Sequence, residues 1–290
     1  MDDTILVTGS TGNVGSQVVK QLSSFKGKVR AAVQSKNRAQ EIKNTGAELV
    51  EMNFNNTETV NAAFKGVQKL FLLTPFAPNM VEISENLVEQ ARKANVDHIV
   101  KQSAFGPNMN QVITRNRLYQ EVEKIIELSG INYTFLRPMP FMQNYLGFAD
   151  SIRTQGTFSI PVGDSKTSFV DTRDIAAVAV QALTKSNEHT NKVYNITGPE
   201  AISNYEIAEI LSNIAKKRIT YVDVSDNDAR RRMKNSGMQE WAVESLMELF
   251  GFQKGGNASI VSLDVERITD RKPISFVQFA TDYADLFRPS

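Results

Sequence analysis

The sequence predicts an α/β fold, with a doubly wound parallel sheet in the first half of the chain and a smaller, mostly helical C-terminal lobe. Short unbroken apolar runs alternate with amphipathic stretches of helical length as far as residue 138. Unbroken apolar runs are typical of strands buried on both faces of a parallel sheet, with helices covering those faces. After Pro138 this rhythm changes, and helical patterns dominate the remaining residues.

The predicted strands are short and built on apolar runs, which favours burial over a half-exposed sheet. They cover residues 4–9, 29–34, 47–53, 69–75, 98–103 and 132–138. The stretches between them have helical periodicity, at residues 13–24, 36–44, 57–65, 79–94 and 111–129. Because crossovers between parallel strands are right-handed, this order predicts a doubly wound sheet of the Rossmann type.

The second half of the chain begins with a helical stretch, 142–156, and a Gly/Pro-rich turn, 160–166. A helix opening at Asp174 and a strand over residues 192–198 follow. Three further helices are predicted, over residues 203–216, 226–250 and 274–287. We therefore expect a first domain over residues 1–138 and a smaller lobe over residues 139–290, with some strands of the second half returning to the main sheet.

The composition excludes several classes of protein. The net charge of +1 argues against a nucleic-acid surface, which normally carries a basic excess. The densest basic run, residues 230–234, has the pattern of a solvated helix face. Without cysteine the chain has no disulfide, no thiolate nucleophile and no cysteine-ligated metal. His98 and His189 lack partners at metal-ligand spacing, so we expect no metal site.

The expected location of the protein is the cytoplasm. The N-terminus "MDDTILV" is acidic and lacks the basic region of a signal peptide. No apolar run approaches the roughly 18 residues of a membrane span.

The segment "TGSTGNVG", residues 8–15, is the strongest motif in the chain. It lies between a strand and a helix, where Gly9 permits a sharp turn, Gly12 lets a diphosphate approach the backbone, and Gly15 lets helix and strand pack closely. Candidate partners of that diphosphate come from the same turn, at Gly9, Ser10, Thr11, Gly12, Asn13 and Val14. The alternative is a tight turn that binds nothing.

The end of the second strand bears on the choice of dinucleotide. An NAD site usually places an acidic residue there, to accept from the ribose 2′-hydroxyl. This sequence has "AAVQSKNRA" instead, in which Ser35 can form a hydrogen bond and Lys36 and Arg38 carry positive charge. A basic first helical turn is not favoured by the helix dipole, which points to an anion nearby. We therefore predict NADP(H) rather than NAD(H); the alternative is ordinary surface charge.

The third, fourth and fifth strands end in further candidates for the cofactor site. Asn53 and Phe54 offer an amide and an aromatic ring for the adenine, and Thr74 and Pro75 would line the middle of the cofactor. A simple strand-ending turn explains Thr74 equally well. Ser103 ends the fifth strand, and the direction of the Lys101 side chain within that strand stays open.

Six segments in chain order resemble the NmrA-like family of atypical short-chain dehydrogenases/reductases, and they cover nearly the whole chain. They are "TGSTGNVG", "LLTP", "SGINYTFLRPMPFMQN", "FVDTRDIAAVAV", "YNITGPEAIS" and "VERITDRKPISFVQFATDYADLF". The resemblance implies a Rossmann fold and an NADP(H) cofactor. The family includes NADPH-dependent quinone and triphenylmethane-dye reductases, and also NADP-binding regulators that turn over no substrate.

The chain departs from the conventional members of the superfamily at their Tyr-x-x-x-Lys pair. Counted back from "SGINYTFLRP", Arg115 stands where the tyrosine would be and Tyr119 where the lysine would be, while Glu123 matches a family glutamate. Tyr119 is the candidate catalytic residue and a candidate cofactor contact, able to hydrogen-bond the ribose or donate to a substrate oxygen. The alternative is a ring that packs in the core.

Electron-poor acceptors such as quinones need no acidic residue of the protein for hydride transfer, only a dry slot that holds them near the nicotinamide. Met139, Phe141, Met142 and Tyr145 could line that slot, and Phe141 could also contact the cofactor; core packing is the alternative for each of them.

The predicted function is an NAD(P)H-dependent oxidoreductase that reduces a quinone or a similar small-molecule acceptor, in a monomer or homodimer. The main alternative is a non-catalytic NADP(H)-binding redox sensor, favoured by the missing Tyr-x-x-x-Lys pair. A sugar-nucleotide epimerase or dehydratase would need that pair and ranks far lower.

Overall fold

The computed structural model describes residues 3–106 and 113–288, and the chain divides into two compact units. Unit 1 comprises Met1–Pro107, Asn116–Pro138 and Thr172–Asn195, and unit 2 comprises Asn108–Arg115, Met139–Asp171 and Ile196–Ser290. The chain thus leaves unit 1 after Pro138 and returns to it at Thr172.

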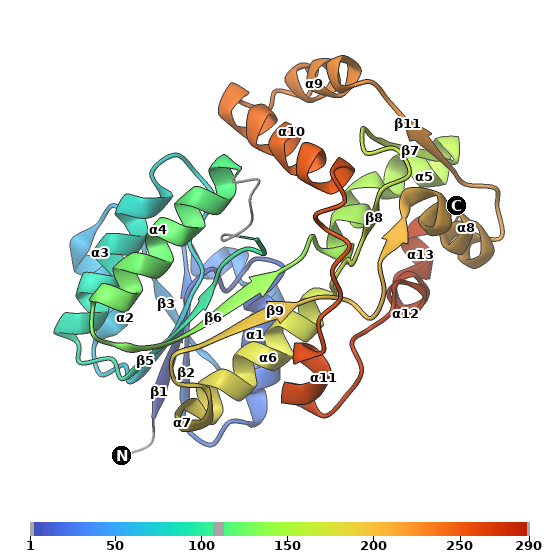
Figure 1. Ribbon diagram of the computed structural model, residues 1–290. Coiled ribbons are helices and arrows are strands. Elements are labelled where there is room, and N and C mark those ends of the chain that lie inside the picture. Colours follow the sequence, from blue (N-terminus) through green and yellow to red (C-terminus); the bar gives the residue numbers. More distant parts are fainter. Residues whose placement is uncertain (1–2, 107–112, 289–290) are drawn as a thin grey trace. The chain divides into compact units, whose positions relative to one another are not determined.

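Unit 1 is built on a seven-stranded sheet in the order β3-β2-β1-β4-β5-β6-β9 (Figure 1). The strands are β1 (Thr4–Val7), β2 (Lys28–Val33), β3 (Glu48–Glu51), β4 (Lys69–Leu72), β5 (His98–Gln102), β6 (Asn132–Pro138) and β9 (Lys192–Ile196). Neighbouring strands from β3 to β6 pair in parallel. The predicted doubly wound parallel sheet is therefore confirmed.

Strand β9 comes from the second half of the chain and adds to the edge at β6. The Asn191 N–H donates to the Tyr133 carbonyl at 2.7 Å, and the Met139 N–H donates to the Ile196 carbonyl at 2.9 Å. Residue numbers increase along both strands from the first of these contacts to the second, so β9 runs parallel to β6.

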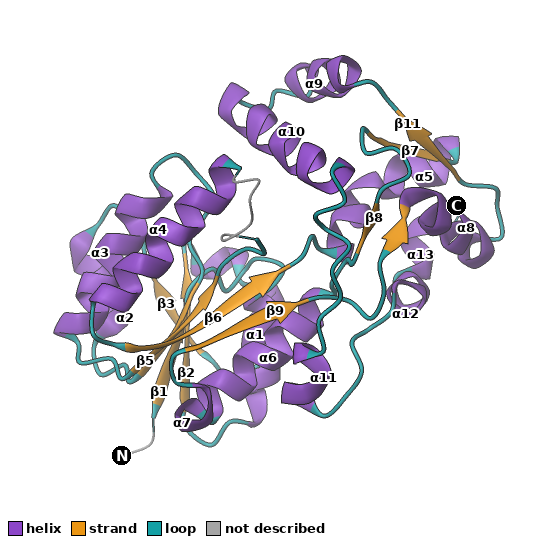
Figure 2. Ribbon diagram, viewed as in Figure 1, coloured by secondary structure: helices purple, strands orange, loops and turns teal. Residues whose placement is uncertain are grey.

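Helices cover both faces of the sheet, as Figure 2 shows. One face carries α2 (Thr57–Phe64), α3 (Met80–Lys93) and α4 (Thr114–Leu128), and the other carries α1 (Gly15–Gln21) and α6 (Thr172–Thr184). A short helix, α7 (Ser186–His189), follows α6. Apolar side chains of α2, α3 and α4 form one core cluster with Leu6, Leu70, Leu72, Ile99 and Phe135 of the strands.

Two predicted helices are wrong in detail. Residues 36–44 form two short 3₁₀ turns, η2 (Lys36–Arg38) and η3 (Gln40–Ile42). Ala39 and Ile42 are buried there, and a spacing of three fits a 3₁₀ turn. Residues 226–250 do not form one helix, because Gly237 adopts φ +85° between α9 (Asp226–Asn235) and α10 (Glu240–Lys254).

Unit 2 is mainly helical and holds two small sheets. β7 (Thr157–Ile160) pairs in parallel with β11 (Thr220–Asp223), and β8 (Lys166–Thr167) pairs antiparallel with β10 (Ile202–Ser203). Its remaining elements are η4 (Met142–Phe148), α5 (Ala149–Gln155), α8 (Asn204–Ala215), α11 (Asp264–Thr269), α12 (Phe276–Asp282) and α13 (Ala284–Phe287). Aromatic rings centred on Tyr145 fill its core, with Phe158, Phe169 and Phe276 edge-on to that ring.

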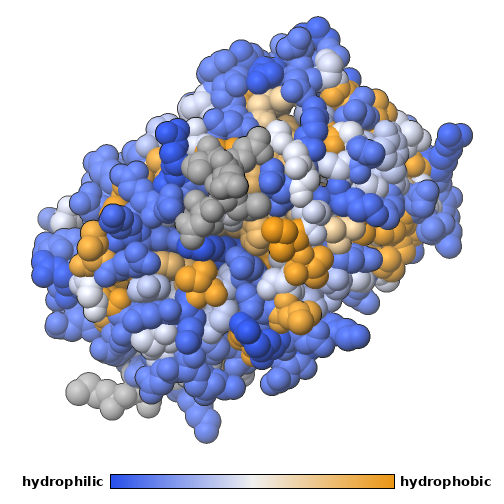
Figure 3. All heavy atoms as spheres, viewed as in Figure 1, coloured by the Kyte–Doolittle hydropathy of each residue, from blue (hydrophilic) through white to orange (hydrophobic). Residues whose placement is uncertain are grey.

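The face of the molecule seen in Figure 3 is predominantly polar. Figure 3 shows charged and polar residues over most of the visible face, with apolar residues in separate small patches. Within residues 3–106 and 113–288, none of the helices combines the length and the apolar character that crossing a bilayer requires. In the predicted basic run, Arg230 pairs with Glu244 and Arg231 with Asp228 on the exposed side of α9.

Candidate functional site

The glycine turn connects β1 to α1 at the carboxyl edge of the sheet. Gly9 has φ +62°, and the Gly12 N–H donates to the Gly9 carbonyl at 3.0 Å. The Ser16 N–H then donates to the Gly12 carbonyl at 3.0 Å, one residue after α1 begins. The N–H groups of Asn13, Val14 and Gly15 precede that bond, so they lie where a helix start presents donors to an anion.

The three glycines are required for different reasons. A Cβ on Gly15 would lie 2.2 Å from the Gly9 carbonyl oxygen, and a Cβ on Gly9 would lie 2.8 Å from the Leu73 side chain. A Cβ on Gly12 would meet only the Gly9 oxygen, at 3.3 Å. The absence of a side chain at Gly9 and Gly15 thus lets the strand and the helix pack closely. At Gly12 it leaves the backbone on the exposed side of the turn uncovered.

The side chains of the turn divide into two groups. Thr11 and Asn13 are exposed, and Val14 is buried. The Ser10 hydroxyl is fully buried and donates to the Ala32 carbonyl of β2 at 2.5 Å. The sequence predicts that the Ser10 hydroxyl contacts the ligand. In the structure that hydroxyl bonds the turn to β2, so only the Ser10 backbone is left for such a contact.

At the end of β2, Lys36 is exposed and Ser35 is half-buried, while the side chain of Arg38 lies outside the described part of the structure. The Lys36 N–H donates to Glu51 Oε1 at 3.3 Å. Glu51 is an acidic residue that the sequence pattern does not single out, because it ends β3 rather than β2. The register could have revealed it, since Glu51 lies level with Val33.

The candidates after β3 and β4 are held within the protein. Asn53 Oδ1 accepts from the Asn55 N–H at 3.0 Å in its own turn, and Phe54 packs against the core cluster of unit 1. Thr74 is buried, with its hydroxyl 3.2 Å from that of Ser84 on α3, and Pro75 is exposed. The Asn53 oxygen and the Thr74 hydroxyl therefore already have hydrogen-bond partners within the protein.

Ser103 differs from these residues. It is buried at the carboxyl end of β5, and its backbone N–H continues the ladder to the Leu136 carbonyl at 2.7 Å. Its hydroxyl, like Gln102 Oε1, has no hydrogen-bond partner among the described residues. Because a buried polar group without a partner is costly, the Ser103 hydroxyl marks a place for a ligand atom or water.

Tyr119 lies on α4 and is 5 % exposed. Its ring stacks on Phe76 with centroids 6.3 Å apart, and Lys101 Nζ lies 5.3 Å from the ring centroid. The structure thus settles the open direction of Lys101, which points to the α4 face of the sheet. Burial lowers the pKa of Lys101 to about 7, and the charge of Glu123 opposes that shift.

The structure does not support an acceptor slot that all four predicted residues line together. Met142 and Tyr145 belong to the core cluster of unit 2, and Met139 is buried. The Tyr145 hydroxyl donates to Asn204 Oδ1 at 2.6 Å, and burial raises its pKa well above the usual value. Phe141 is half-buried and bridges to Val170 within unit 2. The core-packing alternative therefore holds for Met142 and Tyr145.

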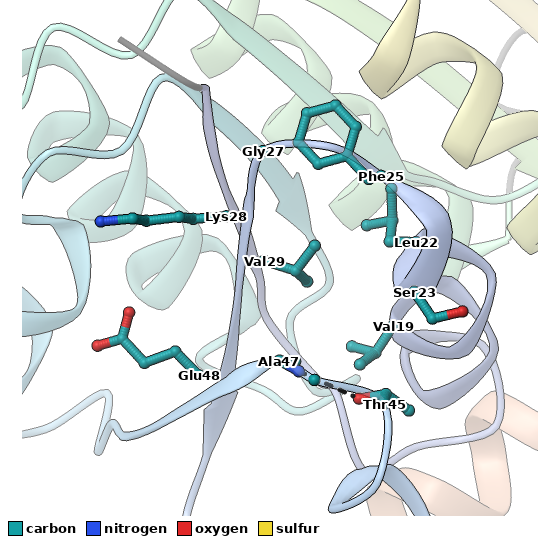
Figure 4. Close-up of a pocket in the computed structure, with 11 residues that line it drawn as sticks. Val19, Leu22, Ser23, Phe25, Gly27, Lys28, Val29, Thr45, Ala47 and Glu48 are labelled. Carbon is teal, nitrogen blue, oxygen red and sulfur yellow. Dashed lines mark hydrogen bonds between the residues drawn. The ribbon is translucent and has the colours of Figure 1, made fainter.

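Unit 1 also has a pocket at the opposite, amino edge of the sheet (Figure 4). It lies among the ends of α1 and η1 (Leu22–Ser24) and the starts of β2 and β3. The side chains of Val19, Leu22, Phe25 and Val29 give it an apolar wall. Ligands of doubly wound sheets bind at the carboxyl ends of the strands, so this pocket is separate from the glycine turn.

Among the described residues, His, Asp and Glu side chains nowhere gather in a group of three able to hold a metal ion.

Two solved structures match the fold over almost the whole chain. The NADPH-dependent quinone oxidoreductase of Escherichia coli, complexed with NADPH, matches with a TM-score of 0.86 at 23 % identity, over 96 % of this chain and 99 % of that one. The Citrobacter sp. triphenylmethane reductase, complexed with NADP(H), matches with a TM-score of 0.84 at 25 % identity, over 97 % and 99 %.

Sequence comparison gives closer relatives. An NAD(P)H azoreductase of Xenophilus azovorans is 36 % identical over 283 residues, which are 98 % of this chain and 99 % of the relative. A (4-alkanoyl-5-oxo-2,5-dihydrofuran-3-yl)methyl phosphate reductase of Streptomyces griseus is 32 % identical over 98 % and 99 %. The model of the NmrA-like family matches residues 1–273. The chain therefore belongs to the NmrA-like family.

Proposed function

We propose that this chain is an NADPH-dependent oxidoreductase that reduces a quinone, an azo compound or a similar electron-poor acceptor by hydride transfer. The observation that carries the proposal is the glycine turn, whose spacing is sterically required at Gly9 and Gly15 and leaves the backbone at Gly12 uncovered. The 36 % identity to an NAD(P)H azoreductase, over nearly the full length of both chains, supports it.

The residues of unit 1 fit such a cofactor. The N–H groups of Asn13, Val14 and Gly15 would hold the diphosphate, since they precede the first helical hydrogen bond. Lys36 and Arg38 would attract a 2′-phosphate, and the Glu51 carboxylate beside Lys36 opposes them. The NADP(H) in the related triphenylmethane reductase supports the assignment of NADP(H) to this chain.

A reduced nicotinamide supplies the hydride when it is bound. The task of the protein is to orient the reactants and exclude water. Ser103 would contribute the buried hydroxyl that lacks a protein partner, and Tyr119 would present its ring or its hydroxyl. Tyr119 is the candidate catalytic residue, and Ser103 lies at the carboxyl end of β5.

The redox-sensor alternative still rests only on the missing Tyr-x-x-x-Lys pair. Relatives that share about a third of their residues with this chain have enzyme names, which favours turnover. An electron-poor acceptor also needs less help from a protein acid than a simple carbonyl does, so the missing pair is compatible with catalysis.

The test is to mix purified protein and NADPH with separate panels of quinones and azo dyes, and to follow loss of the nicotinamide absorbance. We expect turnover with at least one panel, and we expect a Gly12→Val variant of normal stability to lose it. If NADPH binds tightly and neither panel supports oxidation, the proposed enzyme is wrong and the sensor takes its place.

A further inference from the structure

A fully buried lysine lies near the carboxyl end of β5, within unit 1. Lys101 is level with Leu72 on β4 and with Phe135 on β6, so its neighbours on both adjacent strands are apolar. A lysine side chain that starts between two such residues normally reaches water or a carboxylate. Lys101 reaches neither water nor a carboxylate, as its burial and its contacts show.

The ammonium group of Lys101 donates to the carbonyl of Gln102 at 2.6 Å and lies 5.3 Å from the centre of the Tyr119 ring. Among the residues that the structure describes, Lys101 forms no ion pair. Lys69 on β4 provides the contrast, because its ammonium group pairs with Asp3 at 2.7 Å near the other end of the sheet. A buried cation without a carboxylate is costly to keep, and groups of this kind concentrate at functional sites.

Ser103 lies on the same side of the sheet as Lys101. Residues two apart in an extended strand share a face, and the Ser103 N–H continues the β5–β6 ladder. The cation, the Tyr119 ring and the unpartnered Ser103 hydroxyl therefore belong to one end of β5, on the face that α4 covers. Position 119 is also where the conventional helix lysine would stand.

We propose that Lys101 is a positioning residue of the nucleotide site, whose ammonium group holds the Tyr119 ring and supplies positive charge beside a bound nucleotide. This inference rests on the proposed function. The α4 charge that acts on Lys101 is that of Glu123, which is paired with Arg137 of β6. The lysine thus supplies from a strand the charge that position 119 of the helix lacks.

The proposal has a consequence for protonation. The pKa of Lys101 is lowered to about 7 by burial, so free protein above that pH holds the lysine largely neutral. A bound nucleotide is anionic and favours the charged form, so binding takes up a fraction of a proton between pH 7 and 9. In this range the 2′-phosphate is already ionised, because its pKa is near 6.

The experiment is calorimetric titration of NADPH into the wild-type protein at pH 7, 8 and 9, in two buffers of different ionisation enthalpy. Lys101→Met keeps the length of the side chain without the charge, and Lys69→Met is the matched control, a strand lysine away from the site. We expect proton uptake for wild type and Lys69→Met, and none for Lys101→Met. We also expect Lys101→Met to bind NADPH about fivefold more weakly at pH 7, with the difference shrinking by pH 9.

A pH-dependent step near pH 7 in kcat/KM for NADPH, which reports the free enzyme, that only Lys101→Met loses would support the positioning role, since a merely structural lysine would not produce it. Equal proton uptake and affinity in Lys101→Met and wild type would overturn the proposal and leave the proposed function standing. If Lys101→Met does not fold, the wild-type protein still tests the proposal by itself. NADPH binding without proton uptake between pH 7 and 9 would then overturn the proposal. Absence of NADPH binding by wild type would instead refute the proposed function.

Discussion

Arg137 of β6 and Glu123 of α4 form a two-point ion pair that joins the sheet to the helix carrying Tyr119. Arg137 Nε lies 3.0 Å from Glu123 Oε1, and a second guanidinium nitrogen donates to Oε2. The Glu123 side chain is 5 % exposed and that of Arg137 is 15 % exposed, so water does not screen the pair. Glu123, which the family resemblance singled out, is therefore a structural residue of the α4 face.

Glu123→Ala should destabilise the protein by about 3 kcal/mol or more, because it leaves the Arg137 charge buried without its partner. The double variant Glu123→Ala with Arg137→Met should recover much of that loss, since no buried charge then remains. Urea denaturation measures both, and Glu121→Ala, on the exposed side of the same helix, is the control. Equal stability of Glu123→Ala and Glu121→Ala would show that the pair contributes nothing.

Gly15→Ala and Gly12→Ala should separate folding from binding. The Gly15 variant would place a Cβ 2.2 Å from a backbone oxygen, so we expect a loss of about 3 kcal/mol. The Gly12 variant makes a single contact at 3.3 Å and should change stability by about 1 kcal/mol or less, yet weaken NADPH binding strongly. Thermal denaturation and nucleotide titration of both variants check this, and a Gly12→Ala protein that binds normally would contradict it.

The preference for NADPH over NADH should depend on the positive charges of Lys36 and Arg38 and on the opposing negative charge of Glu51. Lys36→Ala combined with Arg38→Ala should weaken NADPH by about tenfold more than NADH, since only NADPH has the 2′-phosphate. Glu51→Gln should act in the opposite direction and strengthen NADPH, because its carboxylate lies beside the Lys36 backbone. The measurement is the dissociation constant of NADPH and of NADH for the wild-type protein and for each variant. An equal loss of both in the lysine–arginine variant would refute the assignment.

Acid should destabilise the fold partly through His98. Its Nε2 lies 2.8 Å from the Thr134 hydroxyl, which itself donates to the His189 carbonyl, so Nε2 must be the donor. Burial, followed by the charges of Lys69 and His189, lowers the pKa of His98 from 6.5 to about 4. Between these values the unfolded chain binds the proton and the folded chain does not, so stability falls as the pH drops from 6.5 to 4.

His98→Gln should flatten that decline, although the lowered pKa of His189 keeps part of it. The measurement is the free energy of unfolding at several pH values between 4.5 and 7.5. Parallel curves for the variant and wild type would show that His98 does not titrate as described.

The fold could be predicted because it depends on local patterns. The buried parallel strands are built on short apolar runs, and the glycine spacing reflects contacts inside one turn, such as that between Gly15 and Gly9. The helix predicted over residues 36–44 is wrong because, among the side chains described there, only Ala39 and Ile42 are buried, and that burial depends on tertiary packing.

The site was less predictable because strand register and competing partners decide it. Ser10 and Thr74 have the right chemistry for a ligand, but the Ala32 carbonyl and the Ser84 hydroxyl already bond them. Glu51 reaches the site only through its register with Val33. The direction of the Lys101 side chain depends on the phase of β5, and the mixed sequence "HIVKQ" of that strand does not reveal the phase.

The most direct test of the account is calorimetric titration of NADPH into the folded wild-type protein and into Gly12→Val. We predict saturable binding at one site per chain for wild type and none for the variant, because a side chain at residue 12 covers the backbone donors of the turn. Wild-type protein that gives no heat with NADPH or NADH, or a Gly12→Val protein that binds as tightly as wild type, would contradict the account.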